Sequence, residues 1–194
     1  RSFLAYLQKE GYKRSSIARK LSTLRSFFRF LCRERILENN PIQGIQTPKR
    51  EKRLPKFLFP KEMDNLLKAP EKEARLGFRD LAIVDTLYAC GLRVSELVGL
   101  DLDSLDLAGN SVRAFGKGRK ERLLPIGKQA VQNLNYYLRK ERPLLLKKNP
   151  EPEKEKAVFL NFRGTRLSAR SVRRILNKLR LLAKLPGQVH PHML

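Results

Sequence analysis

Long apolar runs and cysteines are scarce in this sequence, and each shortage excludes a class of protein. No run of about 18 consecutive apolar residues occurs, so the sequence predicts no membrane-spanning helix and no partner inside a membrane. Cys32 and Cys90 are the only cysteines, and they lack the close spacing of a zinc or redox pair. We therefore expect both to be reduced side chains that fill space in the core, which suits a cytoplasmic protein.

Acidic residues are also few. Only 19 aspartates and glutamates accompany 42 lysines and arginines, which gives a formal net charge of +23 over 194 residues. A surface with this excess of positive charge needs a polyanionic partner. Nucleic acid is the first expectation, and an acidic membrane surface is the alternative. Apolar residues make up 41% of the chain, which is enough for a globular fold.

Several familiar catalytic signatures are missing. The sequence has no GxxxxGK[ST] phosphate loop, no cysteine–histidine cluster with zinc spacing and no GxSxG nucleophile motif. His190 and His192 flank a proline without a third ligand nearby. Asp101, Asp103 and Asp106 suit turns and helix caps better than a magnesium site. We therefore expect neither a metal nor another cofactor.

Residues 1–46 are predicted to form a small helical unit. Apolar side chains recur with helical spacing over residues 15–33 and form a continuous stripe. The rest of this helix carries many cations and few acids, which favours a face that contacts nucleic acid. The cations expected to do so are Arg19, Lys20 and Arg25.

Residues 47–58 differ from both neighbouring parts of the chain. Prolines and a dense run of cations make this segment a poor helix and a poor strand. We interpret it as a linker between two domains. A linker needs no such charge, so we expect the segment to lie along a phosphate backbone.

Residues 59–194 are predicted to form a second, larger domain. The pattern is mostly helical, with one long helix expected from residue 128 to a stop at Pro143. Residues 110–127 change to a strand pattern around a Gly-Lys-Gly turn and predict a β-hairpin, and residues 157–164 predict another short strand. The expected fold class is mainly α with a small antiparallel β-sheet (α+β), arranged as a two-domain DNA clamp.

Three separated residues in the second domain suit one chemical task. Arg93 follows a helix-ending glycine, Lys117 lies between glycines at the hairpin tip, and His192 lies near the last residue. Taken singly, each is an ordinary surface residue. Together they would stabilise a phosphodiester whose charge grows during in-line attack, with arginine as a bidentate donor and lysine as the source of a proton for the leaving oxygen.

These residues lie in motifs that resemble those of the tyrosine recombinases (phage integrase family), in particular the XerC/XerD type. The motifs are LYACGLRVSELVGLDLDSLDL, GKGRKERLLPIG and VHPHML. The upstream stretch SIARKLSTLRSFFRFLCRERILENNPIQGIQTPK resembles the last helices of the family's core-binding, SAM-like domain. The resemblance covers nearly the whole chain in the family's order. It implies site-specific breakage and joining of DNA through a 3′-phosphotyrosine, without metal or ATP.

The resemblance assigns a role to each motif residue. Arg93 matches the first catalytic arginine, and Glu96 matches the acid that supports it. Lys117 matches the hairpin lysine, taken as the general acid for the leaving 5′-oxygen, with Lys120 as the alternative. His192 matches the histidine of the family's His-x-x-Arg motif. Further DNA contacts in the second domain are expected from a set of cations: Arg119, Lys120, Arg122, Arg166, Arg170 and Arg173.

One departure from the family pattern is large. The sequence stops at Leu194, where the motif's arginine would come next, and the tyrosine nucleophile would come later still. Tyr136 and Tyr137 precede the histidine motif and match neither position. We therefore expect this chain, as written, to bind DNA but not to cleave it.

The resemblance also implies partners. Family members act as tetramers on paired double-stranded recombination sites, so a homo- or hetero-tetramer is expected, with resolution of chromosome or plasmid dimers as the process. An integrase of a mobile element would share the chemistry. A non-catalytic DNA-binding protein and a basic RNA-binding or ribosome-associated protein stay open as alternatives.

Overall fold

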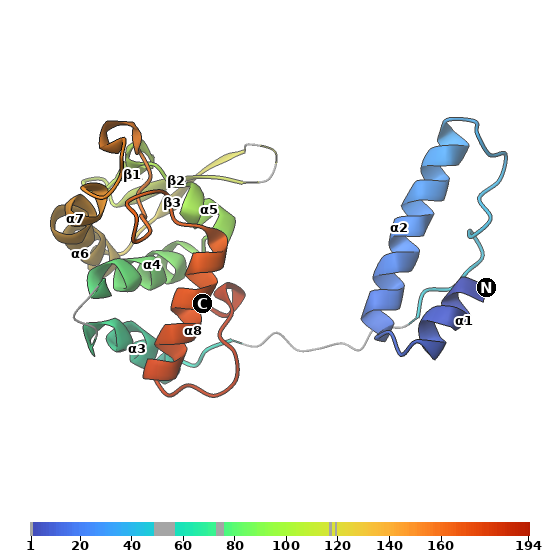
Figure 1. Cartoon of the computed structure of the whole chain (residues 1–194), viewed down its shortest axis with the longest axis horizontal. Helices are drawn as coiled ribbons and strands as arrows, with labels where there is room; N and C mark the ends of the chain where they lie inside the picture. Colours follow the sequence, from blue (N-terminus) through green and yellow to red (C-terminus); the bar gives the residue numbers. More distant parts are fainter. Residues whose placement is uncertain (1, 49–56, 73–75, 117, 119) are drawn as a thin grey trace. The chain divides into compact units, whose positions relative to one another are not determined.

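The computed structural model describes most of the chain. The described residues are 2–48, 57–72, 76–116, 118 and 120–194, and for residues 71, 72 and 192 the description covers the backbone alone. The polypeptide divides into two units, Arg1–Leu54 and Pro55–Leu194 (Figure 1). Residues 49–56 of the predicted linker lie outside the described part, so the linker interpretation stays a prediction.

The first unit is a pair of helices followed by an irregular segment. Helix α1 (Ser2–Lys9) and helix α2 (Arg14–Arg33) are joined by a short turn in which Gly11 adopts a positive φ of 72°. Their contact buries Leu7 against the first half of the apolar stripe on α2. The long helix predicted for this part of the chain is confirmed.

The second unit holds most of the regular structure. Its helices and strands are, in order, α3 (Pro60–Lys68), α4 (Gly77–Cys90), α5 (Val94–Gly99), β1 (Leu105–Asp106), β2 (Ser111–Phe115), β3 (Glu121–Pro125), α6 (Lys128–Tyr136), α7 (Arg142–Leu146) and α8 (Ala169–Leu182). Short 3-10 turns at Leu102–Ser104 and Pro191–Met193 lie within two of the sequence motifs that resemble the family. The predicted fold class, mainly α with a small antiparallel sheet, is confirmed.

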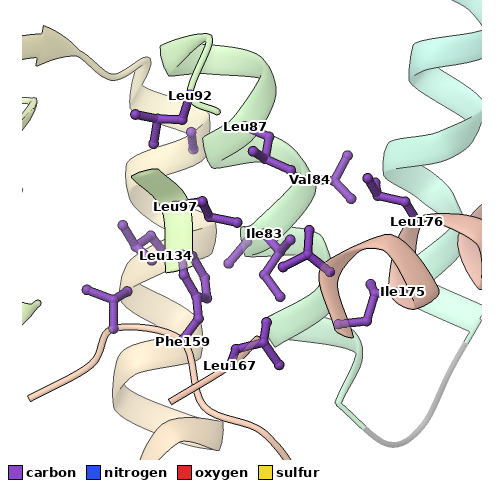
Figure 2. Close-up of a cluster of buried hydrophobic side chains, with 14 of the residues drawn as sticks. Ile83, Val84, Leu87, Leu92, Leu97, Leu134, Phe159, Leu167, Ile175 and Leu176 are labelled. Atoms are coloured by element: carbon purple, nitrogen blue, oxygen red, sulfur yellow. The ribbon is translucent and has the colours of Figure 1, made fainter. Parts of the chain in front are cut away.

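Helix α4 organises the core of the second unit. It is apolar on most of its surface and contacts α3, α5, α6, α8 and β3. Ile83 and Val84 of α4 are fully buried. Figure 2 shows them in one cluster with Leu97 of α5, Leu134 of α6 and Leu176 of α8. Because α5 follows α4 directly and packs on the same core, the junction between the two helices has a fixed position.

The sheet has the strand order β1-β2-β3 and is antiparallel throughout. Val112 pairs with Leu124 and Ala114 with Arg122, and Val112 and Ala114 face the core. This is the hairpin predicted over residues 110–127. The short third strand, β1, was not predicted, because two residues carry no recognisable alternation.

Two local predictions were wrong. The helix predicted to stop at Pro143 continues instead through a π-helical turn, Tyr137–Glu141, into α7. Pro143 lies in the first turn of α7, where a missing N–H is tolerated, so the proline does not break the helix. The expected strand at residues 157–164 makes only isolated bridges among the described residues, Asp101 to Ala157 and Leu160 to Arg166.

A buried side chain explains the missing strand. The hydroxyl of Tyr137 donates a hydrogen bond to the carbonyl of Val158 at 3.1 Å and accepts one from the N–H of Leu160 at 3.0 Å. These backbone groups would otherwise need a neighbouring strand, since buried polar groups must be paired. In the described part of the chain, no helix has the length and apolar character needed to cross a bilayer.

Candidate phosphate and nucleic-acid site

The junction between α4 and α5 fixes the backbone of Arg93. Gly91 closes α4 in the left-handed conformation, with φ 57° and ψ 35°, which glycine adopts at little cost. Leu92 then turns into the core, and Arg93 is the extended residue that begins α5. The Arg93 side chain remains 61% exposed. The backbone at this junction therefore presents a solvent-accessible guanidinium.

Glu96 holds Arg93 at two points. One carboxylate oxygen, Oε2, accepts the backbone N–H of Arg93 at 2.8 Å, and the other, Oε1, accepts the Arg93 Nη1 at 3.0 Å. The Glu96 side chain is only 3% exposed. This contact has the form that the resemblance implied for the supporting acid.

A second guanidinium shares the same carboxylate. Arg122 of β3 donates from Nη2 to Glu96 Oε1 at 2.6 Å. Burial alone raises the pKa of the Glu96 carboxyl, but the hydrogen bonds from Arg93 and the positive charges of Arg122 and Arg93 outweigh it, so the pKa lies below its ordinary value. Glu96 is therefore ionised at neutral pH, and the three side chains carry a net charge of about +1 by formal count.

The base of the hairpin lies against this cluster. The N–H of Gly116 donates to the carbonyl of Lys120 at 2.8 Å and closes the ladder. A Cβ placed on Gly116 would lie 3.6 Å from Glu96 Oε1, so the strand ends pass close to the carboxylate. Lys120 is exposed immediately after the turn. Lys117 and Arg119 lie outside the described residues.

The end of the chain is tied to the second unit. The carbonyl of Met193 accepts the N–H of Leu58 at 3.2 Å, and Leu194 packs against the core. His192 lies in the 3-10 turn Pro191–Met193, but its side chain is outside the described part. The expected meeting of Arg93, Lys117 and His192 therefore stays a prediction.

Other predicted cations of the second unit differ in how they are held. Arg166 donates to the carbonyl of Val98 at 2.9 Å and forms an ion pair with Asp101, so its guanidinium is partly engaged at the end of α5. Arg170 and Arg173 are exposed on α8. The hydroxyl of Ser168 accepts the N–H of Ser171 at 3.2 Å and caps this helix.

The cations of the first unit lie on α2. Arg19 is exposed, and the Lys20 ammonium lies 5.2 Å from the ring centre of Tyr12. Arg25 donates to the hydroxyl of Thr47 and to the carbonyl of Ile45 and so fastens the segment after the helix. Its contact with DNA would have to use the remaining part of the guanidinium.

Two buried or half-buried groups of the second unit, the Tyr137 hydroxyl and the Cys90 thiol, are poor nucleophiles in this structure. Tyr137 is fully buried, and burial raises the pKa of its hydroxyl to about 12. Burial and the charge of Asp85 raise the pKa of the Cys90 thiol to about 11, so it is protonated at neutral pH. The described residues contain no cluster of three or more histidine, cysteine or acidic side chains able to hold a metal ion.

The shared pairing of Arg122 is the feature that sequence reasoning missed. Arg122 was predicted as a DNA contact only. A signal was present, because alternation along β3 puts Arg122 on the same face as Leu124, toward the core. The partner on that face, however, is set by the packing of α5 against β2, which the sequence does not reveal.

Two family models match the chain. Residues 56–194 match the phage integrase family, and residues 1–35 match the phage integrase N-terminal SAM-like domain. Tyrosine recombinase XerC of Pelotomaculum thermopropionicum is 46% identical over 194 residues, which are 100% of this chain and 63% of that protein. Tyrosine recombinase XerD of Proteus mirabilis is 41% identical, over 100% of this chain and 61% of that protein. The chain thus spans less than two thirds of these relatives.

Solved structures share the fold at low identity. The XerH site-specific recombinase bound to palindromic difH substrate, in a post-cleavage complex, aligns with a TM-score of 0.77 and 18% identity, covering 99% of this chain and 57% of that one. A lambda integrase dimer bound to a COC′ core site aligns with a TM-score of 0.70 and 17% identity, covering 99% and 53%. Both likenesses concern the arrangement of helices and strands.

Proposed function

Because this chain belongs to the phage integrase family, we propose that the whole protein is a site-specific tyrosine recombinase of the Xer type. The observation that carries the proposal is the 46% identity to a tyrosine recombinase XerC over all 194 residues of the chain. The exposed Arg93 guanidinium, fixed at its base by the buried Glu96, supports it, because such an arrangement suits recognition of a phosphate.

The proposed reaction exchanges one phosphodiester for another. A tyrosine oxygen attacks the phosphorus, forms a 3′-phosphotyrosine and releases a 5′-hydroxyl; a 5′-hydroxyl of another strand then attacks the phosphotyrosine and restores the DNA bond. No redox partner is needed, and the phosphoryl energy is conserved in the covalent intermediate. The protein must supply donors for the charge that develops on the nonbridging oxygens.

In this scheme the side chains have separate tasks. Arg93 binds a nonbridging oxygen with its forked donors, and Glu96 orients Arg93. Lys117, or Lys120 in its place, gives a proton to the leaving 5′-oxygen. His192 adds a further donor at the phosphate. Arg93 and Glu96 are supported by their geometry in the structure, and the other assignments rest on the sequence motifs.

Double-stranded DNA is the proposed partner of both units. The net charge of +23 supports a largely electrostatic contact. The cations assigned to it are Arg19, Lys20, Arg25, Arg119, Lys120, Arg166, Arg170 and Arg173. Four copies on paired sites are proposed for the active assembly, either of this protein alone or with a second recombinase, in the cytoplasm. Resolution of chromosome or plasmid dimers, linked to chromosome partition and cell division, is the proposed process.

A covalent adduct tests the proposed activity. The bound duplex is first selected from a pool of randomised double-stranded oligonucleotides with the whole protein. It is then synthesised with a nick a few nucleotides to the 3′ side of each candidate phosphate. The short segment that carries the released 5′-hydroxyl then diffuses away after cleavage, and the intermediate is trapped. A protein–DNA adduct that survives denaturing electrophoresis is expected, and it should be absent for Arg93→Ala.

The competing functions give different results in the same experiment. A non-catalytic DNA-binding protein would bind the selected duplex and form no adduct on any nicked form. An RNA-binding protein would prefer structured RNA to duplex DNA in direct competition. An integrase of a mobile element would form the same adduct. The identities of 46% to a XerC and 41% to a XerD, each over the whole of this chain, favour the Xer type.

A further inference from the structure

Arg122 lies on the second strand of the hairpin but is bound to a residue of α5. Its Nη2 donates to Glu96 Oε1 at 2.6 Å, and the Arg122 side chain is still 43% exposed. We propose that Arg122 is a positioning residue for DNA cleavage: through the shared carboxylate of Glu96, it fixes the base of the hairpin to the residue that carries the Arg93 guanidinium. This inference rests on the recombinase function proposed above.

The shared oxygen makes the link unusually direct. Glu96 Oε1 accepts from Arg93 Nη1 at 3.0 Å and from Arg122 Nη2 at 2.6 Å, while Oε2 accepts the Arg93 backbone N–H. Because Glu96 is buried, its charge is poorly screened and both hydrogen bonds to it are charge-assisted. A movement of the hairpin base would therefore disturb the partner of the Arg93 guanidinium as well.

Arg122 lies near the end of β3 that borders the turn. Arg122 pairs with Ala114, and the next pair toward the turn is Phe115 with Glu121. One step further, the N–H of Gly116 donates a hydrogen bond to the carbonyl of Lys120 and closes the ladder. Figure 1 shows β2 and β3 projecting from the body of the unit. The direction of a projecting hairpin depends on what holds its base, and the Glu96–Arg122 contact is one of the contacts that hold the base of this hairpin.

A contact with a DNA phosphate is the rival role for Arg122, and the two roles predict different losses. A phosphate contact contributes to binding, and its removal lowers affinity and reduces the salt slope by about one. A positioning residue leaves binding and salt slope unchanged and lowers the rate of cleavage when all the DNA is bound, since misplacement of about 1 Å at a reacting centre costs up to about a hundredfold.

The chain offers a matched control. Arg113 of β2 forms an ion pair with Glu121 of β3 at 3.6 Å, and both side chains are about half exposed. Arg113 also donates a hydrogen bond to the carbonyl of Asp103 at 2.7 Å. Arg113→Ala thus removes an arginine, an ion pair and a hydrogen bond from the same hairpin without touching Glu96. The test set is Arg122→Ala, Arg122→Lys and Arg113→Ala, with thermal unfolding to show that each variant is folded.

Two measurements decide the proposal. In the whole protein, single-turnover cleavage of a nicked duplex at saturating DNA should fall by about ten- to a hundredfold in Arg122→Ala, with an unchanged dissociation constant and salt slope. Arg122→Lys should recover part of the rate, because the ammonium can still reach the carboxylate. Arg113→Ala should cleave normally. In this 194-residue chain, the Gly116 amide should exchange its hydrogen faster in Arg122→Ala than in Arg113→Ala.

The opposite results overturn the proposal. Weaker binding, a smaller salt slope and a normal saturated rate for Arg122→Ala would make Arg122 a phosphate contact. Unchanged exchange at Gly116 would show that Glu96 does not anchor the hairpin. If the wild type and Arg113→Ala both fail to cleave, the recombinase function fails, whereas the exchange measurement still decides the anchor. If Arg122→Ala does not fold, a normal cleavage rate in Arg122→Gln would overturn the proposal.

Discussion

The backbone N–H of Arg93 and its guanidinium both donate to the Glu96 carboxylate, at 2.8 and 3.0 Å. One acid therefore caps the first turn of α5 and orients the side chain that begins it, which couples the fold of the junction to the direction of the charge. Substitutions of the two residues should accordingly differ. Loss of Arg93 removes the proposed phosphate donor, whereas loss of Glu96 removes both a helix cap and the partner of the Arg93 guanidinium.

Arg93→Ala should abolish strand cleavage and leave duplex binding nearly intact. In the proposed function the side chain is one of many cations for binding but a donor to the reacting phosphate, and loss of such a donor costs about a hundred- to a thousandfold in rate. Single-turnover cleavage and a binding isotherm on the same duplex measure the two effects. Normal cleavage by the variant would remove Arg93 from the site.

Glu96→Gln should destabilise the protein in a pH-dependent way. The folded-state pKa of Glu96 lies below its ordinary value of 4.5, so the stabilisation is present above that value and is lost as pH falls through the folded pKa. The cost at neutral pH is expected at about 1–3 kcal/mol, since the buried amide cannot accept from both arginines as strongly.

Denaturant unfolding at several pH values measures this difference. The gap in unfolding free energy between the wild type and Glu96→Gln should be widest near neutral pH and should shrink below pH 4.5. Glu121→Gln, at an exposed carboxylate, is the control and should change little at any pH. A gap that does not depend on pH would mean that the charge of Glu96 has no stabilising role.

Local signals in the sequence predicted much of this fold and one half of the site. The apolar stripe on α2, the glycine stop of α4 and the hairpin all follow from patterns within one element. Arg93 and Glu96 are three residues apart, so one helical turn is enough to bring them together.

Contacts between distant segments account for what could not be predicted. Arg122 is 26 residues from Glu96, and their pairing needs the hairpin to pack on α5. Tyr137 was taken as one more helical residue, yet its hydroxyl bonds to groups 21 and 23 residues away and replaces a strand partner. Pro143 follows the usual rule for a helix stop in sequence, but the π-helical turn before it lets the helix continue.

Tyr137→Phe should destabilise the second unit without a specific effect on DNA binding. The substitution leaves the Val158 carbonyl and the Leu160 N–H without their partner in the core, which costs about 1–3 kcal/mol. Thermal or denaturant unfolding measures the loss. Tyr136→Phe is the matched control, because that neighbouring side chain is exposed and stacks on Phe78 through its ring. Equal stability of the two variants would contradict a structural role for the Tyr137 hydroxyl.

Binding of this 194-residue chain to duplex DNA should weaken steeply with salt. Each neutralised phosphate releases counterions, so the affinity should fall by orders of magnitude between about 50 and 200 mM salt. Arg170→Ala and Arg173→Ala should each reduce the slope of the double-logarithmic plot by about one, since both residues are exposed on α8.

Lys154→Ala is the control, because its ammonium is already paired with Glu151 at 2.7 Å on an exposed turn. Fluorescence anisotropy titrations at several salt concentrations measure the slopes. A flat salt dependence for the wild type would contradict an electrostatic grip on the phosphate backbone, and equal slopes for all three variants would place the contact elsewhere on the surface.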